Sequence, residues 1–165
     1  MVLFFICYDE FMNYKRIYAD GYSYFLTLVT HGRKPLLVDN IELLRYAFQL
    51  SKQKYDYRID AIVVLPDHLH MIMTPKISTD YSHIISSIKR SFVYGLDTKI
   101  KEEAKAEISA SKYRRNHAGI WQERFYEHTI RDEKDWLEKM EYIQYNPLKH
   151  ELIENIKDWK YTSFT

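Results

Sequence analysis

The sequence predicts an α+β fold: a ferredoxin-like antiparallel sheet with helices packed on it and a further helix near the C-terminus. Two observations carry this prediction. Runs rich in aromatic and β-branched residues, typical of strands, alternate with longer segments whose apolar residues recur at helical spacing. Their order along the chain is β-α-β-β-α-β, which is the split βαβ arrangement. We therefore expect residues 1–165 to form a single domain.

The first strand and the first helix are predicted for residues 22–30 and 38–53. The strand segment, "YSYFLTLVT", consists mostly of aromatic and β-branched side chains, which favour extended backbone. Asp39 is placed to cap the helix, and Glu42 follows three residues later, as in a capping box. One face of this helix is apolar and consists of Ile41, Leu44, Ala47 and Phe48.

The second and third strands are predicted for residues 57–65 and 68–74. Both segments are dominated by apolar and β-branched residues. Pro66 has no N–H to donate, so it must interrupt the ladder between them. The third strand therefore either pairs back on the second as a tight hairpin or continues past a bulge.

A helix and a charged segment follow. Residues 78–96 predict the second helix, with Ile85, Ile88 and Phe92 turned inward. Residues 97–116, "DTKIKEEAKAEISASKYRRN", carry many charges and few large apolar side chains. We expect this segment to be an exposed helical extension or a mobile insertion, and not part of the core.

The last strand and the last helix are predicted for residues 124–130 and 132–146. Asp132 is placed to cap this helix. Pro147 disfavours helical geometry in the residue before it, so the helix should end at Asn146. The face expected to pack on the sheet consists of Trp136, Leu137, Met140 and Ile143.

Composition and charge narrow the class of protein. A hydrophobic content of 46% with 28% charged residues indicates a folded globular chain. The net charge of +1 provides no general positive field for nucleic acid, which leaves a local basic patch as the means of binding it. No stretch reaches the roughly 18 apolar residues of a membrane span. The N-terminal apolar run lacks the marks of a signal peptide, and Cys7 is the single cysteine, so we expect a cytoplasmic protein.

Two histidines stand in the otherwise apolar run "VVLPDHLHMIM" (63–73). His68 and His70 are two residues apart in a predicted strand, so both side chains project from the same face. Two imidazoles on one face can converge on a divalent ion, although two ligands seldom hold a metal without a third. The alternative is a pair of hydrogen-bonded histidines at a sheet surface. The opposite face of the strand consists of Leu69, Met71 and Met73, which can pack on a helix.

The last predicted helix offers the further ligand. Tyr142 and Asn146 are four residues apart and share one face, which differs from the apolar face of the same helix. Each also has a purely structural interpretation. Tyr142 can be a partly buried packing residue, and Asn146 can be a helix C-terminal residue before Pro147.

Four stretches carry a resemblance to a known family: "PDHLH" (66–70), "GIWQERFYEHTIRD" (119–132), "EYIQYNPLKHELI" (141–153) and "DWKYTSF" (158–164). In these the chain resembles the REP-associated tyrosine transposases, of the IS200-like group in the single-tyrosine HUH transposase superfamily. The resemblance runs from about Tyr14 to the C-terminus. Its most specific part is the His-x-His after a strand and a proline, followed about 70 residues later by "YIxxNP" at a helix end.

The resemblance implies an enzyme that cleaves and transfers single-stranded DNA. His68 and His70 match the paired histidines that bind Mg²⁺ or Mn²⁺, and Asn146 matches the polar residue that completes the metal site. Tyr142 matches the nucleophile, which lies on a C-terminal catalytic helix and forms a covalent 5′-phosphotyrosine. The implied substrate is hairpin or repetitive palindromic DNA with a single-stranded flank. The family usually has Asn before the first histidine. In this chain Asp67 stands at that position. We interpret it first of all as a turn residue. A role as an extra metal ligand, or as a partner of a ligand, remains open.

Basic residues interleaved with aromatic ones suit phosphate contacts and base stacking on single strands. The alternative for each of them is ordinary solvated surface charge. The candidates for DNA contacts are Lys89, Arg90, Arg114, Arg115, Arg124, Arg131 and Lys149.

Two other functions remain compatible with the same residues. A hydrolytic metallonuclease would use the histidines with water, would not need Tyr142 and would form no covalent adduct. A non-catalytic nucleic-acid-binding module would show no dependence on metal. The sequence does not decide between a monomer and a homodimer. Our hypothesis is a monomer or a weak dimer, because one core accounts for the apolar faces.

Overall fold

The computed structural model describes residues 21–164 of the chain. The expectations for the N-terminal apolar run and for Cys7 fall on residues 1–20 and lie outside this part. The described residues form an α+β fold around a four-stranded antiparallel sheet, which confirms the predicted fold class. The strand order is β2-β3-β1-β4. The strands are β1 (Tyr24–Val29), β2 (Tyr57–Val64), β3 (His68–Pro75) and β4 (Tyr126–Thr129).

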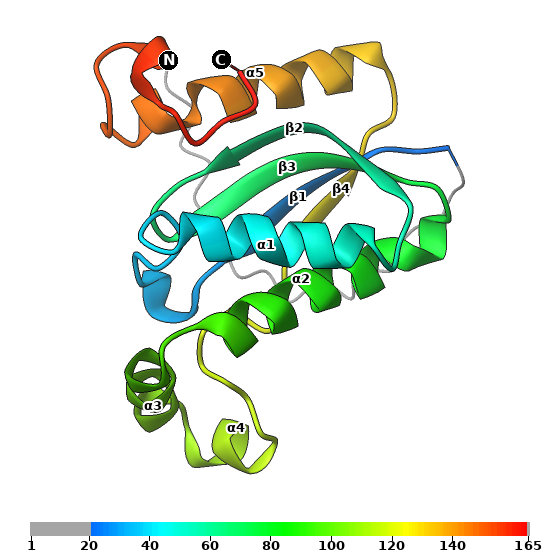
Figure 1. The fold of residues 1–165 in the computed structure, drawn as a ribbon. Helices are drawn as coiled ribbons and strands as arrows, with labels where there is room; N and C mark the ends of the chain where they lie inside the picture. Colours follow the sequence, from blue (N-terminus) through cyan, green and yellow to red (C-terminus); the bar gives the residue numbers. More distant parts are fainter. Residues whose placement is uncertain (1–20, 165) are drawn as a thin grey trace.

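Helices cover both faces of the sheet (Figure 1). Helices α1 (Ile41–Lys52) and α2 (Tyr81–Gly95) pack side by side on one face. Helix α5 (Glu133–Lys149) lies on the opposite face and contacts β2 and β3. The sheet therefore separates two apolar cores, and β3 contributes alternate residues to each.

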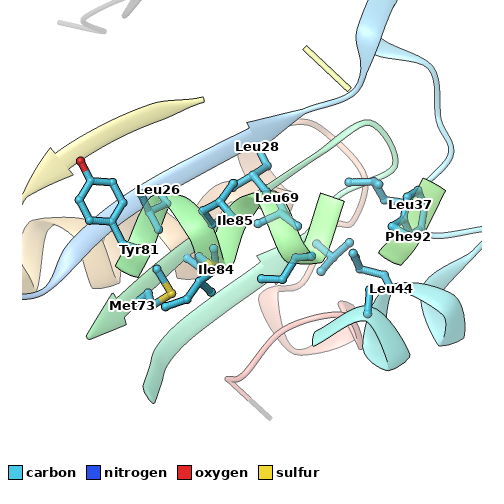
Figure 2. Close-up of a cluster of buried hydrophobic side chains, with 14 of the residues drawn as sticks. Leu26, Leu28, Leu37, Leu44, Leu69, Met73, Tyr81, Ile84, Ile85 and Phe92 are labelled. Atoms are coloured by element: carbon cyan, nitrogen blue, oxygen red, sulfur yellow. The ribbon is translucent and has the colours of Figure 1, made fainter. Parts of the chain in front are cut away.

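The larger core lies between the sheet and helices α1 and α2 (Figure 2). Leu69, Met71 and Met73 of β3 are fully buried in it, as the alternation of the strand predicts. The predicted helical faces also point here. Their fully buried members are Leu44, Ala47, Ile85, Ile88 and Phe92.

The turn between β2 and β3 is a tight hairpin, so the first of the two predicted alternatives is confirmed. The N–H of Leu65 donates to the carbonyl of His68 at 2.8 Å and closes the turn around Pro66 and Asp67. Both the N–H and the hydroxyl of Thr30, just after β1, donate to the carbonyl of Asp67 at 2.9 Å. The hairpin end is thus tied to the neighbouring strand, which holds His68 at a defined position.

The smaller core lies between the sheet and α5. Asp132 caps α5 as predicted, because its side chain accepts a hydrogen bond from the N–H of Asp135. Trp136, Met140 and Ile143 pack toward the sheet. Leu137 is 60% exposed, so its assignment to this face is wrong. Leu137 is rotated by about 100° around the helix axis from Trp136. The apolar stripe that faces the sheet recurs at every third or fourth residue, so Leu137 lies outside it.

The prediction that Pro147 ends the last helix at Asn146 is also wrong, because α5 continues to Lys149. The N–H of His150 donates to the carbonyl of Asn146 at 3.1 Å, and this bond does not need the N–H that proline lacks. The φ angle of proline is itself compatible with a helix. The continuation carries His150 one turn beyond Asn146 on the same side of α5.

The predicted cap of α1 differs as well. The residue before the helix is Asn40, not Asp39, and no side chain caps the helix. The amide Nδ2 of Asn40 instead donates to the carbonyl of Leu36 at 2.8 Å. This bond stabilises the chain entering the helix, so the cap that the sequence suggests is replaced by a contact within the preceding loop.

Residues 97–116 form two helices, α3 (Thr98–Glu107) and α4 (Ala110–Arg114), so the helical alternative holds. They extend beyond α2, away from the sheet (Figure 1). Most of their side chains are exposed. The expectation that the segment takes no part in the core is nevertheless wrong for Ala104, which is buried in the larger core, and Ile100 packs at the margin of that core. Within residues 21–164, no helix is long and apolar enough to cross a membrane.

Candidate active site

His68 and His70 project from β3 on the α5 side of the sheet. Both are buried, and their ring centroids lie 5.0 Å apart at an interplanar angle of 85°. The pair therefore shares one face, as the spacing in the sequence predicts. The rings lie close enough for nitrogen atoms of both to reach one small ion.

Two residues of α5, Tyr142 and Asn146, and His150 just after its end face this pair at successive turns. The ring of Tyr142 lies 5.1 Å from that of His70, and the ring of His150 lies 5.0 Å from that of His68. Residues four apart on a helix lie on the same side. Asn146, midway between two residues that contact the histidines, therefore faces the pair.

The site contains buried polar atoms that have no partner within the described part of the chain. Asn146 is fully buried, and neither its Oδ1 nor its Nδ2 makes a hydrogen bond. The Nε2 atom of buried His70 has no hydrogen-bond partner either. Leaving such a group unsatisfied costs about 1–3 kcal/mol. These buried polar atoms are available to a ligand.

In each of the two histidines, the Nδ1 atom has a partner within the protein. The Nδ1–H of His68 donates to Oδ1 of Asp67 at 2.6 Å, and the carboxylate also accepts from Arg33 at 2.9 Å. Nδ1 of His70 lies 2.8 Å from the hydroxyl oxygen of Thr27. With Nδ1 protonated in both rings, each Nε2 presents a lone pair. A partner on the second ring nitrogen is typical of histidines that bind metals.

The electrostatics of the site favour neutral imidazoles. Burial is the main cause that holds the pKa of His70 well below its ordinary value. Repulsion from Lys149 and Arg33, and from the protonated forms of His68 and His150, acts in the same direction. Burial also lowers the pKa of His68, although Asp67 acts in the opposite direction. Neutral imidazole is the form that binds a metal ion.

The donor atoms available to a metal ion here are two imidazole nitrogens and one amide oxygen. Across residues 21–164 there is no group of three His, Cys, Asp or Glu side chains that could hold a metal ion. The third donor available here is Oδ1 of Asn146, a neutral oxygen. Imidazole and amide ligands together suit a divalent ion that also has sites left for phosphate oxygen or water.

Tyr142 lies at the open side of this donor set. Its side chain is 37% exposed, and the Nζ of Lys149 lies 5.1 Å from its ring centroid. The ring of Phe25 packs against its edge at 5.7 Å. Tyr145, three residues further along α5, is 48% exposed. No ring contact of Tyr145 with either histidine occurs among the described residues.

Comparison with known proteins assigns the chain to a family. The family model described as "Transposase IS200 like" matches residues 18–146, a range that includes both histidines, Tyr142 and Asn146. The chain belongs to the IS200-like transposase family. A protein of Haemophilus influenzae described as a REP-associated tyrosine transposase is 40% identical over 154 residues, covering 92% of this chain and 85% of that protein. The REP-associated tyrosine transposase of Escherichia coli is 33% identical over 154 residues, covering 92% and 82%.

A solved structure has the same fold. It is a REP-associated tyrosine transposase bound to a REP hairpin, and it matches this transposase with a TM-score of 0.74 at 31% sequence identity. The match covers 93% of this chain and 82% of the other. The family resemblance seen in the sequence, and the expectation of a transposase, are thereby confirmed.

Two of the basic residues predicted to contact DNA, Lys149 and Arg131, lie in or next to α5. Lys149 stands over the ring of Tyr142, within the site. Arg131 is exposed at the start of α5, where its Nε lies 3.5 Å from Oδ2 of Asp135. Arg124 is exposed in the loop before β4. Of these residues, Lys149 lies directly beside Tyr142.

The other four basic candidates lie elsewhere. Lys89 and Arg90 belong to α2, on the opposite face of the sheet, and the Nζ of Lys89 donates to the carbonyl of Gln122 at 2.9 Å. Arg114 and Arg115 lie in the helical extension, at α4 and just after it. The fold therefore does not bring these four side chains to the histidine pair.

Sequence reasoning missed the residues that support the site from other strands and loops. Thr27 pairs with His70 across β1 and β3, and Arg33 reaches Asp67 from the segment after β1. Phe25 stacks on the ring of His70 at 5.6 Å. The only signal for Thr27 is its place in a strand. Its partner is set by the register between strands, which the sequence does not display.

Proposed function

We propose that this transposase cuts and rejoins single-stranded DNA through a covalent bond between Tyr142 and a 5′ phosphate. The observation that carries the proposal is the position of the Tyr142 ring, 5.1 Å from buried His70 and one turn from the unsatisfied amide of Asn146. A related protein is known in complex with a REP hairpin. We infer that hairpin DNA with a single-stranded flank is the substrate here too, and that the enzyme works in the cytoplasm.

We infer further that His68, His70 and Asn146 hold Mg²⁺ or Mn²⁺. The fit rests on Nε2 of His70 and Oδ1 of Asn146, which are buried and have no partner among the described residues. Asp67 contacts Nδ1 of His68 and Thr27 contacts Nδ1 of His70, and these contacts orient the two rings. When bound, such an ion neutralises phosphate charge and orients the phosphodiester.

In the reaction that we propose, the phenol oxygen of Tyr142 attacks the phosphorus atom. A bond forms between this oxygen and phosphorus, and the bond from phosphorus to the 3′ oxygen breaks. The phenol gives up its proton, and the departing 3′ oxygen gains one. A free phenol ionises only near pH 10. The ammonium group of Lys149, 5.1 Å from the ring centroid, would stabilise negative charge developing on the phenol.

The covalent intermediate conserves the energy of the cleaved phosphodiester. The free 3′-OH can attack the phosphotyrosine in a second step, which restores a DNA strand and releases Tyr142 without any nucleoside triphosphate. A hydrolytic metallonuclease could use the same histidines with water as the nucleophile. The aromatic contact between Tyr142 and His70 favours the tyrosine mechanism, because hydrolysis has no need for a phenol at that place.

The test compares two tyrosines on the same helix. Tyr142→Phe removes only the attacking oxygen and keeps the ring packing, so it should eliminate the covalent protein–DNA adduct. Tyr145→Phe is the matched control and should keep most of the activity. The assay is a denaturing gel with labelled hairpin DNA and Mg²⁺ or Mn²⁺.

Other outcomes would contradict the proposal. A persistent adduct in Tyr142→Phe, or loss only in Tyr145→Phe, would exclude Tyr142 as the nucleophile. Cleavage without any adduct in the unchanged protein would instead support the metallonuclease.

A further inference from the structure

We propose that the sheet surface beside Tyr142 is a binding subsite for one unpaired nucleotide next to the scissile phosphate. Tyr126 would stack on its base, and Lys139 would contact its phosphate. The inference rests on the proposed function and specifies where the single-stranded flank lies. Neither residue was among the DNA contacts predicted from the sequence.

Tyr126 lies on the same face of the sheet as the site. In the antiparallel pairing of β1 and β4, Tyr126 is directly opposite Thr27, and Thr27 contacts Nδ1 of His70. Residues directly opposite in an antiparallel pair project from the same face. The side chain of Tyr126 is 57% exposed, although it belongs to a strand of the central sheet. Helix α5 makes most of its contacts with the sheet on β2 and β3, and Tyr126 on β4 stays open to solvent.

The floor of the subsite is a continuous row of aromatic rings. Phe25 is buried and stacks on the ring of His70 at 5.6 Å with an interplanar angle of 15°. Its ring meets Tyr142 at 5.7 Å and Tyr126 at 6.3 Å, both edge to face. Phe25 therefore connects the nucleophile to Tyr126. A nucleotide whose phosphate lies at Tyr142 has an aromatic surface within reach of its base.

Two lysines of α5 lie on either side of Tyr142 along the helix. The Nζ of Lys139 lies 5.6 Å from the ring centroid of Phe25, and the Nζ of Lys149 lies 5.1 Å from that of Tyr142. At 1.5 Å per residue, these lysines are separated by about 15 Å along the helix axis. A DNA strand that crosses the tyrosine would therefore meet a cation before it and another after it.

The chemistry of this surface suits a single strand. Base–aromatic stacking needs an exposed base face and tolerates any base, whereas the bases of a duplex already stack on one another. Lysine provides a point charge that any phosphate can pair with. The subsite would therefore hold the flank in place without reading its sequence.

The test measures binding without catalysis. All proteins carry Tyr142→Phe, the buffer contains EDTA, and the probe is a twelve-nucleotide oligothymidine strand with one central 2-aminopurine. Tyr126→Ala should weaken binding by about 5- to 100-fold and relieve the quenching of 2-aminopurine. Tyr126→Phe should retain both. Tyr94→Ala is the matched control, because Tyr94 is 89% exposed on α2, across the sheet from the site.

The contribution of Lys139 is measured by salt dependence. Lys139→Ala should make the slope of log affinity against log salt shallower by roughly one phosphate contact. Lys134→Ala is its control, because Lys134 is 87% exposed on the first turn of α5. An unchanged slope in Lys139→Ala, or an equal change in Lys134→Ala, would exclude Lys139 from the subsite.

Three results would overturn the subsite. They are unchanged affinity of Tyr126→Ala, the same Tyr126 dependence with a blunt duplex of equal length, and failure of the parent protein to bind the strand. Adduct formation is scored separately, in protein that retains Tyr142. Binding that depends on Tyr126 without any adduct would reject the tyrosine mechanism and keep the subsite. An adduct together with binding that does not depend on Tyr126 would reject the subsite and keep the tyrosine mechanism.

Discussion

The carboxylate of Asp67 accepts a hydrogen bond of 2.6 Å from Nδ1 of His68, the next residue in the chain. Its second oxygen accepts from Arg33 at 2.9 Å. Burial raises the pKa of Asp67, but the bonds with His68 and Arg33 outweigh it, and the pKa is lowered. Asp67 is thus a turn residue that also fixes one ring of the histidine pair.

We expect Asp67→Ala to lower the affinity for Mn²⁺ by about 10- to 100-fold, because His68 loses the partner that orients its ring. Asp67→Asn keeps an acceptor without the charge and should lose less. Calorimetric titration of the DNA-free protein with Mn²⁺ measures both. Asp56→Ala is the control, because Asp56 pairs with Lys76 at the exposed far end of the hairpin. Equal Mn²⁺ affinity in Asp67→Ala and the unchanged protein would leave Asp67 with a role in the turn only.

Replacing His68 and His70 together with Ala should abolish the divalent-ion-dependent cleavage of single-stranded hairpin DNA. The apolar residues of β3 that face the larger core are unaffected, so the variant should still fold. Circular dichroism establishes the fold, and a gel assay with Mg²⁺ or Mn²⁺ establishes the cleavage. Undiminished cleavage by a folded double variant would remove the histidines from the mechanism.

Asn146→Leu should stabilise the protein in EDTA and abolish metal binding. The fully buried amide makes no hydrogen bond within the described residues, so a side chain of similar size without polar atoms removes an unsatisfied group. The expected gain is about 1–3 kcal/mol in the free energy of unfolding. Thermal melts in EDTA and in Mn²⁺ give both results. A lower melting temperature in EDTA would mean that the amide is satisfied in solution.

Lys89 should make stability rise with pH. Burial lowers its pKa from 10.5 to about 8. The unfolded chain therefore binds more protons than the fold between about pH 8 and pH 10.5, and the free energy of unfolding increases through that window. The contribution is on the order of 1–3 kcal/mol, because Lys89 is only partly buried and solvent screens part of the effect.

Lys89→Met tests this assignment. The variant should be more stable than the unchanged protein at pH 7, and the difference should disappear above about pH 10.5. Urea unfolding at several pH values measures it, and the comparison cancels other groups that titrate in the same range. Affinity for single-stranded DNA should not change, because Lys89 lies across the sheet from the site. A difference in stability that does not vary with pH would contradict the shifted pKa.

Local patterns in the sequence determined the elements and their faces. The alternation in 68–74 places both histidines on one side of a strand and Leu69 on the other, because successive side chains of extended backbone point in opposite directions. The spacing of Tyr142 and Asn146 places them on one side of a helix. Both relations follow from backbone geometry over a few residues. The order of the elements along the chain was enough to predict the fold class.

Which of these faces meet depends on packing between elements that are far apart in the chain. Helix α5 packs on the face of β3 that carries the histidines. This packing brings the ring centroid of Tyr142 to 5.1 Å from that of His70. Strand register selects Thr27 as the partner of His70, and the choice of layer turns Lys89 away from the site. Contacts between residues far apart in the chain depend on how whole apolar faces pack, and no periodicity within a single segment records that packing.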